Sequence, residues 1–358
     1  MPGHKTAAAL FFAIALSACT HAPPAAPAQE FTVVDPAKAG WNADALAEAA
    51  SYAQSQKTTG FLIIQNRKVI YEHNWPLPPD AAQFEKNFTY GPAADGALQE
   101  DVASQQKSFI AILAGVAADK GLLDVSKPVT AYLGAGWSKA SPDQEAKITV
   151  LNLMQMNSGL SESFEYEAPA GAKFFYNTPV YATMKPVLEK VSGKSLDALT
   201  REWLTDPAGM SDTAWRQRPE IFAKVGNPTG LVTTPRDSAK MGQILLDHGL
   251  AASGKRIVSD AWIKAMLAHS PTNPAYGRFW WLNGGDWSLA PGAAPQRKDG
   301  PLIPAAPADL VAALGAQDRK VFVVPGRKLI VVRMGQQAPD RDFNQQLWLR
   351  VMKAAPPA

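Results

Sequence analysis

The sequence predicts an α+β fold in which an antiparallel sheet, built from both ends of the chain, is flanked by helices and carries an inserted helical lobe. Two β-rich runs near the beginning form GFLIIQNRKVIYEHN, and the last quarter holds four strand-like runs, GRFWWLN, DLVAALGA, KVFVVP and KLIVVRMG. The segments between them have mainly helical spacing. The simplest packing joins both sets of strands in one sheet, and a site is expected in the cleft between the sheet and the helical lobe.

Residues 1–18 are predicted to be a signal peptide and not part of this fold. A short basic region, His4 and Lys5, precedes an apolar run over residues 7–15 that is too short to span a bilayer but suits the core of a signal. The tetrad LSAC follows and resembles a bacterial lipobox, which would make Cys19 the lipidated first residue of the mature protein. An ordinary cleaved signal with an incidental cysteine is the alternative.

Residues 19–30 are expected to tether the folded body, residues 31–358, to the membrane. The stretch THAPPAAPAQE favours a semi-extended chain of roughly 3 Å per residue. Cys19 is the only cysteine, so no disulfide can form within the chain. The resemblance to lipoproteins implies a lipid anchor through Cys19 on the periplasmic face of the bacterial cell envelope. Thr20 stands where an Asp is associated with inner-membrane retention, which points to the outer membrane.

The elements of the folded body follow from periodicity and end signals. WNADALAEAASYAQSQ has helical spacing with Asn42 as its N-cap, and Asn66-Arg67 separate two β-rich runs as the turn of a hairpin. Residues 75–103 show no clear periodicity, and a loop this long indicates a functional segment. The helical lobe is placed at roughly residues 104–270. Helices are predicted from Ser104 onward, at 148–156, 180–192, 196–204, 235–248 and 260–269, and at 343–352.

Composition argues against several classes of function. The chain has 358 residues, 46% hydrophobic and 19% charged, which is typical of a globular protein. Its net charge is only +3 and no Lys/Arg stripe with interleaved aromatics occurs, so nucleic acid is not an expected partner. The sequence has no His-Glu-x-x-His, cysteine pair or acidic calcium loop, so no metal or other cofactor is expected. It also lacks Gly-x-Ser-x-Gly, so a Ser-His-Asp triad has no support.

The main chemical signal is Ser104-Gln105-Gln106-Lys107, at the start of an apolar helix. Residues three apart on a helix lie on one face, about 5–6 Å apart at Cβ, so Ser104 and Lys107 can meet. A serine needs a base to become a nucleophile, and a lysine can be that base if burial or a nearby cation lowers its pKa. N–H groups at the helix start would favour an oxyanion. Taken alone, the tetrad also fits a serine cap followed by a solvated lysine.

Further segments connect this tetrad to a known family. VASQQKSF with GLLDVSKPV, then ITVLNLMQMNSGL, GAKFFYNTPVY, GNPTGLVTTPRDSAKMGQILLDHG and ALGAQDRKVFVVPGRKLIVVRMG occur in order along the chain. With these segments the sequence resembles the serine β-lactamase and penicillin-binding-protein superfamily, and within it the class-C-like esterases and aminohexanoate-oligomer hydrolases. The resemblance covers nearly the whole chain after the signal. It implies a β-lactamase/transpeptidase-like fold with Ser104 and Lys107 as catalytic residues.

The second motif of such proteins, Tyr-x-Asn, corresponds to Tyr176-Asn177-Thr178. The resemblance implies that Tyr176 is catalytic and helps to pass the proton between nucleophile and leaving group. Asn177 and Thr178 are candidates for substrate binding. Thr178 stands where asparagine is usual and has a hydroxyl but not the geometry of an amide, which puts its role in doubt.

The third motif, normally Lys-Thr-Gly or His-x-Gly, corresponds to Ala313-Leu314-Gly315. Gly315 would let the backbone approach a bound substrate, and the Ala316 N–H would be an oxyanion donor beside that of Ser104. The usual cation is missing, and it helps to bind the substrate carboxylate in β-lactamases and D,D-peptidases. Its absence therefore argues against both activities.

Two more residues are candidates for substrate binding. Arg319 could replace the missing cation, and Trp280, in an aromatic cluster, could line an apolar pocket. A solvated turn residue and a core aromatic are the alternatives. The expected function is that of a serine hydrolase acting through an acyl-enzyme on a small-molecule ester or amide. A D,D-peptidase or β-lactamase, and a catalytically silent cell-envelope binding protein, are the alternatives.

Overall fold

The computed structural model describes residues 31–291 and 295–357, together with Met1 and Gly3. The predicted signal peptide, the tether and the lipidation site at Cys19 lie outside the described residues. Within the described part of the chain, no helix has both the length and the apolar character needed to cross a membrane.

The main sheet has seven strands and confirms the predicted fold class. Its strand order is β1-β3-β2-β13-β12-β11-β8, and every neighbouring pair is antiparallel except β1 and β3. The turn between β2 and β3 places Asn66 and Arg67 at φ 51° and 61°, the left-handed backbone that a tight hairpin requires. The strands are β1 (Thr32–Val33), β2 (Thr58–Gln65), β3 (Lys68–Asn74), β8 (Trp281–Leu282), β11 (Val311–Gly315), β12 (Arg319–Val324) and β13 (Leu329–Gly335).

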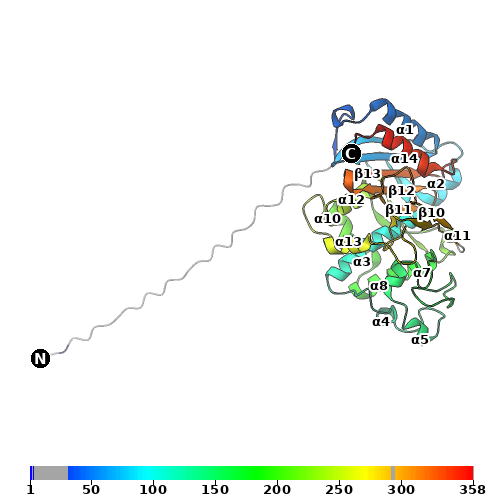
Figure 1. Ribbon diagram of the computed structural model, residues 1–358. Helices are drawn as coiled ribbons and strands as arrows, with labels where there is room; N and C mark the ends of the chain where they lie inside the picture. Colours follow the sequence, from blue (N-terminus) through cyan, green and yellow to red (C-terminus); the bar gives the residue numbers. More distant parts are fainter. Residues whose placement is uncertain (2, 4–30, 292–294, 358) are drawn as a thin grey trace.

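Helices cover both faces of this sheet. Helices α1 (Ala43–Ser55) and α14 (Phe343–Ala354) pack against each other on one face, although they come from opposite ends of the chain (Figure 1). The predicted cap of α1 is present, because the Ala45 N–H donates to Asn42 Oδ1 at 3.0 Å. Helix α12 (Pro235–Leu246) lies against β2, β12 and β13 on the other face (Figure 1). This double cover explains why every residue of β12 and β13 is buried.

In the sequence, a mainly helical region lies between the first and last strands of the main sheet and includes α3 (Gln106–Asp119), most of which is buried. The remaining α-helices of this region are short. They are α4 (Thr130–Leu133), α5 (Pro142–Glu145), α6 (Val150–Met154), α7 (Thr178–Ala182), α8 (Met184–Ser192), α9 (Leu196–Thr200), α10 (Asp206–Ala208), α11 (Glu220–Ala223) and α13 (Asp260–Met266).

A second, four-stranded sheet was not predicted. Its order is β4-β5-β7-β6, and two of its strands fall in residues 75–103, where the sequence indicated a long loop. The strands are short, and β5 pairs with β7 from more than a hundred residues further along, so no local pattern reveals the pairing. The elements are α2 (Ala82–Phe88), β4 (Thr89–Pro92), β5 (Leu98–Asp101), β6 (Ala214–Gln217) and β7 (Thr229–Thr233). A separate ribbon joins β9 (Trp287–Leu289) and β10 (Arg297–Asp299).

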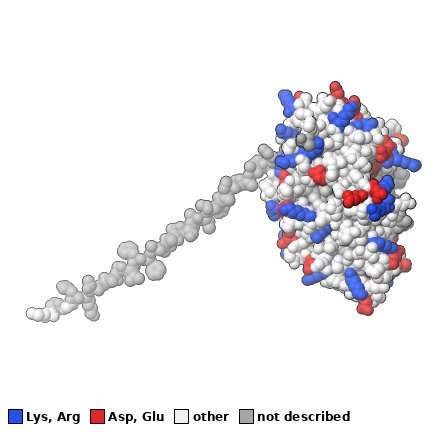
Figure 2. Space-filling view, viewed as in Figure 1, with Lys and Arg blue, Asp and Glu red and all other residues white. Residues whose placement is uncertain are grey.

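The charged side chains are distributed without a dominant sign. On the face shown in Figure 2, Lys and Arg lie among Asp and Glu, and no extended patch of one sign is visible. This mixture agrees with the small net charge of +3.

Candidate active site

The structure brings Ser104 and Lys107 together where the small sheet meets the helical lobe. Ser104 lies in a 3₁₀ turn, Ala103–Gln105, directly after β5, and Lys107 lies in the first turn of α3. Lys107 Nζ is 3.0 Å from Ser104 Oγ. A hydroxyl and an amine at this distance can exchange a proton, so the spacing read from the sequence corresponds to a real contact.

Lys107 is buried among aromatic rings. Its side chain is only 1% exposed, and Nζ lies 4.8 Å from the ring centre of Tyr176 and 4.6 Å from that of Tyr181. Burial holds the pKa of Lys107 well below its ordinary value, and the positive charges of Arg218 and Lys185 lower it further. An uncharged amine is a base, whereas the solvated ammonium of the alternative interpretation is not.

Tyr176 is the third member of this group, and it lies directly before Asn177, the residue that caps α7. Burial raises the pKa of Tyr176 to about 12, and a hydrogen bond with Ser104 opposes part of that rise. Its ring is stacked on Trp281 at 5.6 Å and meets the edge of Tyr276 at 6.0 Å. These rings fix the phenol beside Ser104 in its protonated form. Trp281 was not among the residues predicted for the site.

Asp101 stabilises the backbone turn that precedes Ser104. Ala103 has φ 47°, a left-handed conformation that is unusual for a residue with a side chain. Its N–H donates to Asp101 Oδ1 at 2.8 Å, which stabilises this turn. Sequence analysis did not identify Asp101, because nothing local distinguishes it from a surface carboxylate.

Gly315 lies against the segment that carries Ser104. A Cβ on Gly315 would sit 2.3 Å from the carbonyl oxygen of Val102, so only glycine allows β11 to come this close. Among the described residues, neither the Ala316 N–H nor the Ser104 N–H has a protein hydrogen-bond acceptor. Two N–H groups without an acceptor, on adjacent segments, are what an oxyanion hole requires.

The last two residues of the second motif differ in role: Thr178 is at the site, and Asn177 supports the fold. Thr178 Oγ1 lies 3.2 Å from Lys107 Nζ, so Thr178 is part of the group. Asn177 is buried and caps α7: its Oδ1 accepts from the Val180 N–H, and its Nδ2 donates to the Leu160 carbonyl. With both ends of its amide used inside the fold, Asn177 does not bind substrate, and that expectation is corrected.

Arg319 is not a substrate-binding cation. Its side chain is 0% exposed, and its Nε is 3.1 Å from Glu100 Oε2 in a buried ion pair. Its Nη1 also donates to the Ala316 carbonyl at 2.8 Å. The expectation that Arg319 replaces the missing cation is therefore wrong, because its charge is already paired. Arg319 instead fixes the turn that carries the Ala316 N–H.

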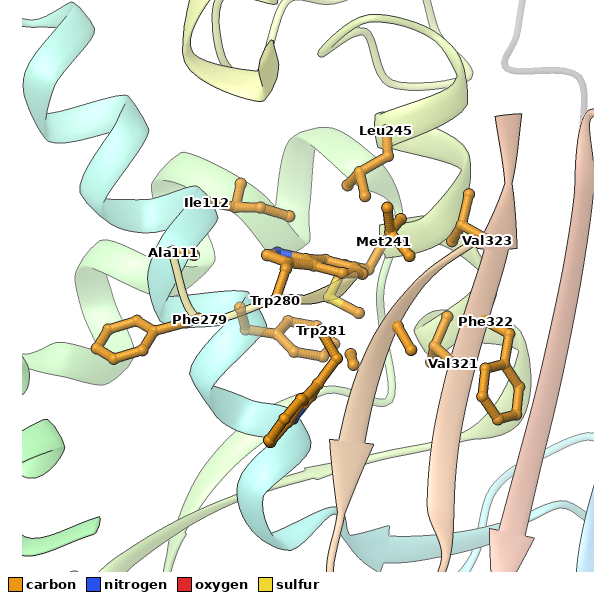
Figure 3. Close-up of a cluster of buried hydrophobic side chains, with 14 of the residues drawn as sticks. Ala111, Ile112, Met241, Leu245, Phe279, Trp280, Trp281, Val321, Phe322 and Val323 are labelled. Atoms are coloured by element: carbon orange, nitrogen blue, oxygen red, sulfur yellow. The ribbon is translucent and has the colours of Figure 1, made fainter. Parts of the chain in front are cut away.

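Trp280 is also a core residue and does not line a pocket. Figure 3 shows its indole among Ile112, Met241 and Leu245, and its side chain is 0% exposed. The neighbouring Trp281 is the aromatic that reaches the site, through its contact with Tyr176. The expectation that Trp280 lines a pocket is therefore corrected: Trp280 precedes β8 and packs in the core, whereas Trp281, the first residue of β8, packs against Tyr176.

Within the described residues, no group of three or more His, Cys, Asp or Glu side chains could hold a metal ion. The groups that the structure brings together at the site are the hydroxyl of Ser104, the amine of Lys107 and the phenol of Tyr176.

Several solved structures share this fold. A Bacteroides dorei protein assigned to the β-lactamases superimposes with a TM-score of 0.67 at 15% identity, covering 88% of this chain and 99% of its own. A Bacillus anthracis protein assigned as a 6-aminohexanoate-dimer hydrolase gives 0.61 at 17% identity, covering 84% and 80%. EstCE1, a hydrolase with promiscuous acyltransferase activity, gives 0.59 at 14% identity, covering 87% and 98%. At these identities the similarity shows the fold alone.

No curated protein sequence matches the chain. A sequence profile of the family described as Beta-lactamase does match it, over residues 43–355. That span begins with α1 and ends one residue beyond α14, so it includes every strand of the main sheet except β1, and all three motif regions. From the profile match and the shared fold, we conclude that the chain belongs to the β-lactamase family.

Proposed function

We propose that this protein is a serine hydrolase that cleaves esters or small amides through an acyl-enzyme, with Ser104 as the nucleophile. The observation that carries the proposal is the 3.0 Å approach of Lys107 Nζ to Ser104 Oγ inside a buried pocket of aromatic rings. A lysine kept only as a structural donor would not need a site that lowers its pKa.

In the first half-reaction, Ser104 Oγ bonds to the carbonyl carbon of the substrate as its proton passes to Lys107 Nζ. The negative charge that develops on the carbonyl oxygen is held by the N–H groups of Ser104 and Ala316. The intermediate then breaks its bond to the leaving alcohol or amine, which receives a proton through the Tyr176 hydroxyl. Water attacks the acyl group along the same path and releases the acid and free Ser104.

Lys107 is a better candidate than Tyr176 for the group that takes the proton from Ser104. The pKa of Lys107 is lowered, so its amine is uncharged, and able to act as a base, at a lower pH than that of a solvated lysine. The pKa of Tyr176 is raised to about 12, so its phenolate is scarce there. Tyr176 is therefore proposed as a protonated relay to the leaving group, and Lys107 as the general base.

The third motif favours substrates without a carboxylate. Ala313 has no charge and is buried, and Arg319 is already paired with Glu100. Binding a β-lactam or a D-Ala-D-Ala terminus at this position would leave its carboxylate without a cation. The contact of Thr178 with Lys107 argues against the silent binding protein, because the unusual residue of the second motif still contacts the catalytic group.

The proposal is tested by comparing the protein with its Ser104→Ala variant. Both are incubated with a fluorophosphonate probe and with p-nitrophenyl acyl esters, and labelling and turnover should depend on Ser104. Nitrocefin and a D-Ala-D-Ala peptide are run in the same assay, and much slower turnover of both is expected. Equal behaviour of the two proteins toward the probe and the esters would favour the silent binding protein.

The location of the enzyme is a separate proposal that depends on the sequence alone. We propose that the protein is a lipoprotein of the cell envelope, anchored through Cys19. The lipobox-like tetrad and the Pro/Ala-rich stretch after it support this. Metabolic labelling with an alkyne-tagged fatty acid should mark the wild-type protein and leave Cys19→Ser unlabelled.

A further inference from the structure

A second buried lysine lies near the same Tyr181 ring as Lys107. Lys185, in α8, places its Nζ 5.8 Å from the ring centre of Tyr181, while Lys107 Nζ is 4.6 Å from the same centre. Lys185 is only 7% exposed. Its Nζ donates to Asn227 Oδ1 at 2.5 Å and to the Thr229 carbonyl at 2.6 Å. Both acceptors are neutral, so hydrogen bonds hold the ammonium without cancelling its charge.

Asn227 connects this lysine to an ion pair at the nucleophile. Arg218 Nη1 donates to the Asn227 carbonyl, and the guanidinium binds Asp101 through two bonds, Nε to Oδ2 at 2.6 Å and Nη2 to Oδ1 at 2.7 Å. Asp101 is the residue that accepts from the Ala103 N–H, beside Ser104. A Cβ on Gly230 would lie 2.1 Å from Asp101 Oδ2, so the pair fits only against glycine. Contacts through Asn227, Arg218 and Asp101 thus connect Lys185 to the turn that carries Ser104.

The charges of these residues leave an excess of positive charge near Lys107. Asp101 forms an ion pair with Arg218, so the negative charge of this carboxylate balances the positive charge of the guanidinium. Lys185 is then the additional cation. After burial, the charges of Arg218 and Lys185 are the two causes that lower the pKa of Lys107. The tyrosines that face Lys107 contribute no charge near neutral pH, because burial raises the pKa of both Tyr176 and Tyr181.

Lys185 itself titrates close to neutral pH. Burial and the charge of Arg218 lower its pKa to about 7, while Asp101 and, on its own helix, Glu189 act in the opposite direction. Lys185 is therefore charged on the acidic side of neutral pH. A charged Lys185 disfavours the uptake of a proton by Lys107, and a protonated Lys107 would cease to be a base.

We propose that Lys185 is a positioning residue of the catalytic site, whose ammonium group, held by Asn227 and Thr229 beside Tyr181, keeps the Lys107 amine uncharged and able to take the Ser104 proton. The inference rests on the proposed function, since it assigns Lys107 the role of base. A purely structural role for Lys185, as a hydrogen-bond donor that ties α8 to the chain before β7, is the competing explanation.

Three substitutions separate charge from hydrogen bonding. Lys185→Gln keeps a donor but removes the charge, Lys185→Arg keeps both, and Lys185→Met removes both. The pH dependence of kcat/KM for a p-nitrophenyl ester is measured for each. We expect the acidic limb to move up by about 1 pH unit in the Gln and Met variants and to stay near the wild-type position in the Arg variant. Lys190→Met, an exposed lysine on the same helix, is the matched control and should leave the profile unchanged.

An acidic limb that stays in place in both the Gln and Met variants, with only the rate reduced, would overturn the proposal in favour of the structural role. The same holds if Gln behaves like wild type while Met alone is impaired. The Gln variant keeps the test decisive if Lys185→Met does not fold.

A second measurement does not depend on turnover. In Ser104→Ala protein with 13Cε-labelled lysine, NMR follows the titration of Lys107, whose resonance is assigned by its loss in Lys107→Met. Adding Lys185→Gln should raise the Lys107 midpoint by about 1 pH unit. An unchanged midpoint would refute the inference. If the wild-type protein does not hydrolyse esters but the midpoint moves as expected, the proposed function fails and the electrostatic role of Lys185 stands.

Discussion

Thr178 Oγ1 lies 3.2 Å from Lys107 Nζ, at the position where related proteins usually have an asparagine. The hydroxyl therefore keeps a polar contact with the proposed base, although its side chain is shorter. This contact positions the amine whose lone pair must face Ser104 Oγ. Its removal is the most direct way to test whether the unusual second motif is functional.

Thr178→Val replaces the hydroxyl by a methyl group of nearly the same size. We expect kcat toward p-nitrophenyl esters to fall about fivefold, the effect of one lost hydrogen bond of roughly 1 kcal/mol. Thr178→Ser retains the hydroxyl and should keep most of the activity. Equal loss in both variants would mean that the methyl packing of Thr178, and not its hydroxyl, matters.

Gly315→Ala tests the close approach of β11 to the nucleophile segment. The new Cβ would meet the Val102 carbonyl at 2.3 Å, so the strand or the turn must shift. Since a displacement of about 1 Å at a reacting group can cost 10²-fold, we expect kcat/KM to fall about 100-fold. Ala316→Gly adds no atom and keeps the N–H, so it should retain most of the activity. Normal turnover by Gly315→Ala would place the oxyanion donors elsewhere.

The strands of the main sheet could be predicted because the run of apolar residues that marks each strand is local in the sequence. Each of β12 and β13 contains a run of four apolar residues, VFVV and LIVV, and the turn at Asn66 and Arg67 lies between two β-rich runs. The contact of Ser104 with Lys107 could also be predicted, because helical geometry alone brings together residues three apart. In each case the decisive neighbours lie within a few residues of one another in the sequence.

The surroundings of the site could not be predicted, because they depend on pairings across the chain. Asp101 meets Arg218 only because β5 pairs with β7, and β7 pairs in turn with β6. The sequence placed Arg319 in a turn but could not show that Glu100, from a segment without periodicity, neutralises it. Asn177 was misassigned for the same reason, since a polar residue type does not reveal whether its partner is the backbone or a substrate.

Glu100→Gln tests the buried ion pair behind the oxyanion turn. Glu100 and Arg319 are both 0% exposed, and Glu100 Oε2 also accepts from the Gly335 N–H at 3.1 Å. Removing one charge leaves the other buried and unpaired, so the free energy of unfolding should fall by about 3–5 kcal/mol. Glu220→Gln breaks an ion pair whose side chains are 73% and 82% exposed and should change stability by less than about 0.5 kcal/mol. Urea unfolding curves measure both, and similar effects would contradict this assignment.

Lys107→Met should make the protein more stable while abolishing its activity. Methionine fills a similar volume, and unlike lysine it does not have to lose a proton when it is buried. The pKa of Lys107 is lowered in the folded protein, so between that pKa and the ordinary value of 10.5 the unfolded chain binds one more proton than the folded one. Wild-type stability relative to the variant therefore rises with pH, by up to about 1.4 kcal/mol per pH unit in this window.

The advantage of Lys107→Met should accordingly be about 1–4 kcal/mol at pH 7 and should shrink by pH 9.5. Urea unfolding at the two pH values measures it, and Lys190→Met serves as the control because Lys190 is exposed. A variant that is less stable than wild type at pH 7, or a difference that does not change with pH, would show that Lys107 is charged in the folded protein. A charged Lys107 could not take the proton from Ser104, so this outcome would also remove the base from the proposed mechanism.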